Sequence, residues 1–191
     1  MDRHQILKQT NAFSMADGLF FGVYCSIGFL CMIKGVANNT LAMLGLVVTL
    51  TVPVMGCYFA RKFERQVRDD APVSFGRAYL YSVLLYIYAS VLLAACVFIY
   101  FQWFDKGAFV DSYVMVFNSP ETQAALKQSG MDASFDEAMR QSGFRSVREM
   151  LSSISAFDMS STMLNMNVMA GLLLALPTAL FGKTRQRDVR Q

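Results

Sequence analysis

Histidine is almost absent from this chain of 191 residues, because His4 is its only one. Cysteine is also scarce: Cys25, Cys31, Cys57 and Cys96 lie inside apolar stretches and show no CxxC spacing. A buried free cysteine behaves as a small hydrophobic residue. We therefore expect no disulfide. A single histidine near the N-terminus also nearly excludes a histidine-based metal or acid–base site.

The sequence also lacks the motifs of common enzyme classes. It contains no glycine-rich phosphate loop, no GxSxG, no HExxH and no acidic pair within its apolar blocks. Asp69 and Asp70 lie among basic residues, and Asp136 and Glu137 begin a predicted helix, where acids favour the helix dipole. Because an enzyme needs converging polar groups, we expect a protein without catalytic residues, cofactor or metal.

Charge is sparse as well: 16% of the residues are charged and 54% are hydrophobic, whereas a soluble domain is about 25% charged. The apolar residues form four blocks, at about residues 18–33 (or from Phe13), 41–60, 78–104 and 163–182, and the last three contain no charge. A spanning helix needs about 20 such residues, because the hydrocarbon core is about 30 Å thick. No small-x-small cleavage site follows the first block, so we expect it to be retained. The fold class is therefore an all-α integral membrane protein with four transmembrane helices.

Four spans place both chain ends on one side of the membrane, and the basic residues are unevenly divided between the sides. Eleven of the 17 lie on the side of the termini: Arg3, Lys8, Arg61, Lys62, Arg65, Arg68, Arg77, Lys183, Arg185, Arg187 and Arg190. By the positive-inside rule this side is the cytoplasm. We expect a multi-pass protein of the bacterial cytoplasmic membrane with both termini cytoplasmic.

Arg61, Lys62, Arg65, Arg68 and Arg77 gather between the second and third apolar blocks. They are predicted to fix the topology of the chain. They could also bind anionic lipid head groups, at about 1 kcal/mol for each basic residue. The two roles are compatible.

The polar segment between the third and fourth blocks contains residues typical of helix starts and helix ends. "NSPETQAALKQSG" supplies a cap, a proline near the first helical position and a final glycine. We predict two or three short amphipathic helices, which either lie on the membrane surface or fold over the bundle. The predicted organisation is an N-terminal cytoplasmic arm 1–14, a transmembrane hairpin 15–60, a basic cytoplasmic loop 61–75, a transmembrane helix 76–104, an extracytoplasmic helical segment 105–159, a transmembrane helix 160–182 and a basic cytoplasmic tail 183–191.

Two stripes of small residues mark the first and fourth spans. Small side chains let helices approach closely in lipid, so the stripes are candidate helix-packing interfaces. They either pack one bundle together or form a homo-oligomer or partner interface. The residues are Ser14, Gly18, Gly22 and Ser26 in the first span, and Gly171, Ala175 and Ala179 in the fourth.

Polar residues inside the spans are few. Asn165 and Asn167 lie near the outer end of the fourth span, where amides usually bond to a neighbouring helix. Alternatively they line a polar path together with Thr49 and Thr51. Asp17 is the only acid close to the first span. It either caps that helix or lies at the cytoplasmic interface, and a proton-relay role lacks a visible partner.

The stretch "APVSFGRAYLYSVLLYIYASVLLAACVFIYFQWFDKGAF" resembles the third-helix region of the bacterial domain-of-unknown-function family 4199. Phe75 and Gly76 open the span, Phe104 and Asp105 close it, and Lys106 stands where we expect a proline. The resemblance, by length and span layout, covers nearly the whole chain. It implies four spans in a bacterial cytoplasmic membrane and no established activity. It ranks a membrane glycosyltransferase that uses a polyprenyl-phosphate sugar first among candidate partners.

These observations lead to one expected function and one alternative. The first is a non-enzymatic accessory or scaffold protein of the cell envelope. It would contact membrane lipids and bind another membrane protein, or itself as a homo-oligomer, with no nucleic-acid role. The alternative is a small oligomeric membrane transporter or channel. A lipid-modifying enzyme is the weakest candidate, because acid–base residues are missing.

Overall fold

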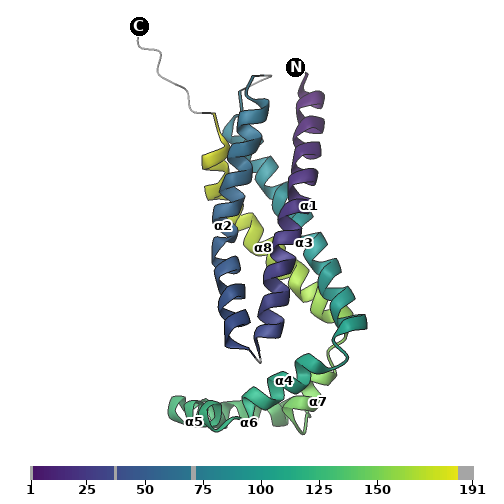
Figure 1. Ribbon diagram of the computed structural model, residues 1–191, viewed down its shortest axis with the longest axis vertical. Helices are drawn as coiled ribbons and strands as arrows, with labels where there is room; N and C mark the ends of the chain where they lie inside the picture. Colours follow the sequence, from purple (N-terminus) through teal and green to yellow (C-terminus); the bar gives the residue numbers. More distant parts are fainter. Residues whose placement is uncertain (1, 37, 70–71, 185–191) are drawn as a thin grey trace.

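The computed structural model describes residues 2–36, 38–69 and 72–184, and this part of the chain is all α (Figure 1). Four long helices are apolar enough to cross a membrane. They are α1 (Arg3–Gly35), α2 (Asn39–Val67), α3 (Phe75–Ile99) with its π-helical continuation η1 (Tyr100–Phe104), and α8 (Ala156–Gly182). The predicted fold class is confirmed.

Each long helix begins at a polar residue whose side chain accepts hydrogen bonds from free backbone amides. Asp2 and Ser155 form capping boxes at α1 and α8. Asn38 and Ser74 cap α2 and α3. Since α1 begins after Asp2, Asp17 lies well inside a helix, and of the two alternatives for Asp17 the one in which it caps the first span is wrong.

Three helices extend well beyond the apolar blocks, and α8 is one of them, because it begins at Ala156, before the fourth block at 163–182. α1 includes most of the segment expected to be an N-terminal arm, and α2 runs on to Val67. Residues 57–68 contain no glycine or proline to end the helix. Phe63 and Val67 in this extension are fully buried. Arg61, Lys62 and Arg65 therefore lie on the last turns of α2, not in a loop.

The four long helices form a bundle in which α3 contacts both α1 and α8, while α2 contacts α1 and α8. In the most apolar 18-residue stretch of each helix, 44% of the stretch is buried in α3 but only 11% in α2. α3 is therefore the central helix, and α2 presents most of its surface to lipid. Much of the core lies toward the end of the bundle where α1 begins and α8 finishes, which we call the terminal end.

Close helix approach depends on glycine at two places in particular. A Cβ atom on Gly22 of α1 would lie 2.9 Å from Leu92 Cβ of α3, and one on Gly171 of α8 would lie 2.6 Å from Tyr86 Cβ of α3. These distances are too short for any side chain. The two glycines let α1 and α8 rest directly on α3.

Four short helices follow η1 and form an arm at the opposite end of the bundle: α4 (Ala108–Phe117), α5 (Pro120–Ser129), α6 (Met131–Gln141) and α7 (Val147–Ser152). Figure 1 shows the arm running across the bundle end, at a steep angle to the long helices. Gly107 and Gly130 adopt φ of 86° and 68°, a left-handed conformation that glycine adopts without strain. They allow the chain to turn into α4 and between α5 and α6.

Candidate functional site

A polar network joins three long helices near the terminal end. Asp17 of α1 is 3% exposed. Its Oδ1 accepts a hydrogen bond from Lys62 Nζ of α2 at 2.6 Å, and its Oδ2 accepts one from the Tyr81 hydroxyl of α3 at 2.8 Å. The Tyr81 hydroxyl also lies 3.3 Å from the carbonyl oxygen of Phe59, and its ring stacks on Phe63 with centroids 4.1 Å apart. We call Asp17, Lys62 and Tyr81 the acidic clamp.

The acidic clamp satisfies a carboxylate that would otherwise be costly inside a span. Both carboxylate oxygens of Asp17 are bound, and each bond comes from a different helix. The Lys62 side chain is 37% exposed, so the ion pair reaches from the interior to the surface of α2. These contacts link α1 to both α2 and α3.

A second set of contacts surrounds Arg77, at the start of α3. Its side chain is buried, and Nε donates to Thr10 Oγ1 at 3.2 Å while Nη2 donates to Gln9 Oε1 at 2.6 Å. The guanidinium also lies 5.5 Å from the ring centroid of Phe63. Arg77 therefore points into the bundle and ties α3 to α1.

A cavity of about 220 Å³ lies between all four long helices, further from the terminal end. Its lining includes Thr49, Ser90 and Asn167. Pro53 also lines it, and because proline has no backbone N–H, α2 lacks one backbone hydrogen bond there. Each of the three polar side chains donates to a carbonyl of its own helix, at 2.7–2.9 Å. The cavity is mostly apolar.

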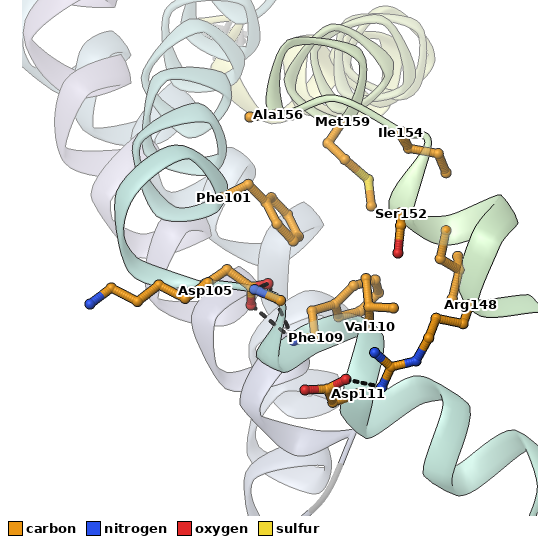
Figure 2. Close-up of a pocket in the computed structure, with 13 residues that line it drawn as sticks. Phe101, Asp105, Phe109, Val110, Asp111, Arg148, Ser152, Ile154, Ala156 and Met159 are labelled. Carbon is orange, nitrogen blue, oxygen red and sulfur yellow. Dashed lines mark hydrogen bonds and ion pairs between the residues drawn. The ribbon is translucent and has the colours of Figure 1, made fainter.

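A pocket of about 340 Å³ lies where the arm joins the bundle, between η1, α4, α7 and the start of α8 (Figure 2). Phe101 and Met159 contribute apolar surface. Arg148 of α7 and Asp111 of α4 form an ion pair at the rim. The Asp105 carboxylate is buried and accepts hydrogen bonds from the backbone amides of Gly107 and Phe109, both at 3.1 Å. This carboxylate fixes the turn into α4.

The small-residue stripes predicted from the sequence lie inside the bundle. All seven members are buried: Ser14, Gly18, Gly22, Ser26, Gly171, Ala175 and Ala179. Gly18 and Gly22 face α3, as does Gly171. These faces are occupied by helices of the same chain, so a partner would have to contact another surface.

The five basic residues proposed for topology or lipid contact do not form one group. Arg61, Arg65 and Arg68 are exposed, Lys62 is bound to Asp17, and Arg77 is buried. Their role in topology remains a prediction.

The intramembrane polar residues are similarly divided. Thr49 and Asn167 line the cavity, and Thr51 bonds to the Tyr24 hydroxyl. Asn165 is exposed on α8. The four cysteines are half-buried and unpaired, and Cys25 lines the cavity. In the described ranges, no three histidine, cysteine or acidic side chains gather as metal ligands would.

Sequence reasoning missed the partners of Asp17. The signal was available: α1 and α2 are antiparallel, and Lys62 follows the second apolar block about as closely as Asp17 precedes the first. Tyr81 gave no such signal, because it is one of several tyrosines in the third span and the local sequence does not distinguish it from the others.

The bundle of four long apolar helices defines the class of this protein: it is an all-α, multi-pass integral membrane protein. Residues 16–184 match the family described as "Protein of unknown function (DUF4199)", and the chain belongs to this family. The family resemblance predicted from the sequence is confirmed. Neither a curated protein nor a solved structure matches the chain.

Proposed function

We propose that this protein is a non-enzymatic accessory protein of the bacterial cell envelope, and that its arm binds another membrane protein. A glycosyltransferase that uses a polyprenyl-phosphate sugar is the first candidate partner. The single observation that carries the proposal is the arm, which exposes large apolar side chains at the bundle end.

The exposed large apolar side chains of the arm lie on two of its four helices. On α4 they include Tyr113, Met115 and Val116, and on α6 Met131. Met115 is 66% exposed, far more than a core methionine would be. Exposed apolar groups gathered on one segment mark surfaces that contact a partner or a membrane. The long helices expose apolar residues too, but lipid covers those.

Sidedness follows from the charge distribution. The proposed orientation places the terminal end, with eleven of the 17 basic residues, in the cytoplasm. The arm then lies outside the cytoplasmic membrane. The expected partner therefore has a domain or loop on the outer side.

Photo-crosslinking tests the proposal. A photoreactive amino acid is placed at Met115 or Met131 in the full chain, and native membranes are irradiated before detergent pull-down. We expect a crosslinked product that contains one different membrane protein. The matched control carries the same group at Leu173, which is exposed on α8, and should give lipid adducts only. Products containing only lipid or a second copy of the chain, from both arm positions, would refute the proposal.

A small oligomeric transporter or channel is the second candidate, and one observation favours it: Thr49 and Asn167 line the cavity between the four long helices. Single cysteines at these positions, in a variant whose native cysteines are replaced by alanine, report on water access. A transport path predicts labelling by aqueous thiol reagents. Complete protection at both positions, with a labelled control at exposed Gln128, would eliminate this candidate.

A further inference from the structure

We propose that the end of α2 binds the phosphate head group of an anionic phospholipid of the surrounding membrane. The site is a hollow of about 330 Å³ lined by Tyr58, Arg61, Lys62, Arg65 and Gln66, which we call the basic hollow. The inference is independent of the proposed partner, because it requires only that the long helices span a bilayer.

The basic hollow carries uncompensated positive charge. Arg61 and Arg65 are exposed and, among the described residues, neither guanidinium forms an ion pair or hydrogen bond. Of the nearby acids, Asp17 binds Lys62 and Asp69 lies 3.8 Å from Arg68. Glu64 accepts a hydrogen bond from the Thr184 hydroxyl at 3.2 Å and, in the part of the chain that the structure describes, forms no ion pair with Arg61 or Arg65. A phosphate diester would supply the missing anion, since arginine binds phosphate oxygens through paired N–H groups.

Arg61 is also held close to the hollow. Its guanidinium lies 5.5 Å from the ring centroid of Phe181 on α8, and α8 packs beside α2. A cation over an aromatic ring is attracted by the negative face of the ring. The contact restrains the Arg61 side chain at the edge of the basic hollow that faces α8.

An apolar track next to the basic hollow selects a lipid over free phosphate. Val47, Leu50, Val54 and Tyr58 are all exposed and follow each other at intervals of three or four residues. Such intervals place them on one face of α2, in line with Arg61 and Arg65. An acyl chain can therefore lie along the track while its phosphate occupies the basic hollow. Tyr58, at the junction, is the amphipathic residue typical of this depth.

α2 is the helix best placed for a bound lipid, because only 11% of its most apolar window is buried by the rest of the bundle. Basic residues at the end of a span attract anionic head groups. The opposite end of α2 begins at Asn39, after the cap residue Asn38, and its first turn contains no basic residue. The proposed site is thus specific to one end of the helix, and to one leaflet.

The test is a lipid titration of the purified full chain, followed by native mass spectrometry. Phosphatidylglycerol is the anionic probe, phosphatidylcholine the zwitterionic one, and inorganic phosphate the head group without acyl chains. We expect phosphatidylglycerol to bind in preference to the other two. In R61Q/R65Q its affinity should fall roughly 30-fold, equivalent to about 2 kcal/mol. R61K/R65K retains both charges, so it should lose far less affinity.

The control is R140Q/R145Q, which removes the same charge from the arm. Circular dichroism verifies that each variant is folded. The proposal is overturned if R140Q/R145Q weakens binding as much as R61Q/R65Q. It is also overturned if R61Q/R65Q binds phosphatidylglycerol as tightly as the original chain, or if inorganic phosphate binds as well as the lipid does.

Discussion

The acidic clamp permits a quantitative prediction, because its two charged members differ in burial. The Asp17 side chain is 4% exposed and that of Lys62 is 37% exposed. In Asp17→Asn the unpaired ammonium of Lys62 can turn toward water or head groups. In Lys62→Met, by contrast, the carboxylate of Asp17 stays inside the bundle with only the Tyr81 hydroxyl as a donor.

The magnitudes follow from this asymmetry. Breaking a buried ion pair by removing one partner costs about 3–5 kcal/mol, and Lys62→Met should approach the lower value. Asp17→Asn should cost about 1–2 kcal/mol, because the amide oxygen can still accept the Tyr81 hydrogen bond. The double variant should lose less unfolding free energy than the two single variants lose in sum, because it leaves no buried charge without a partner.

Equilibrium unfolding in mixed detergent micelles, followed by circular dichroism, measures these differences. Asp69→Asn is the control at the same end of the bundle: the Asp69 side chain is 92% exposed, so its replacement should change stability by less than about 0.5 kcal/mol. The reasoning fails if Asp17→Asn destabilises the protein more than Lys62→Met does. Strict additivity of the two substitutions would also refute it.

Two further predictions concern helix packing and capping. Gly22→Leu should abolish the folded bundle in detergent, because even a Cβ atom there lies 3.1 Å from the carbonyl oxygen of Ala89. Gly76→Leu should fold normally, because nothing lies within 4 Å of its added Cβ. Ser155→Ala removes the side-chain acceptor for the Asp158 amide at 3.1 Å and should cost about 1 kcal/mol. The same unfolding assay measures all three, and a stable Gly22→Leu protein would contradict the described packing.

The four spans could be predicted from the sequence because a bilayer imposes a length and a polarity on any helix that crosses it. The helix bounds were less accurate. α2 continues to Val67 because Phe63 and Val67 find a core at the terminal end, and hydropathy cannot show that a charged stretch is half buried by its neighbours. The polar segment was predicted to contain two or three short helices, whereas the arm has four. The helix that was not singled out is α4, which is apolar and is preceded by Gly107, a residue without a capping side chain.

The candidate sites depended on pairing between helices, which local sequence does not show. Asp17 stood out as the only acid close to the first span, but its partners lie 45 and 64 residues away. The register between α1, α2 and α3 brings them together. That register depends in turn on close contacts such as the one between Gly22 and Leu92. The sequence could therefore point to Asp17 as a candidate site residue, but it could not show which residues of the other helices contact it.

The division of the molecule into two ends has a consequence for function. The acidic clamp, the contacts of Arg77 and much of the core lie toward the terminal end, so stability is concentrated there. The arm packs chiefly within itself, with α4 against α7 and α5 against α6. Substitutions of its exposed residues, Met115 and Met131 among them, therefore leave the packing of the bundle intact. A loss of binding to the proposed partner in such variants can be attributed to the arm surface, whereas a loss caused by Asp17 or Lys62 variants reflects the fold.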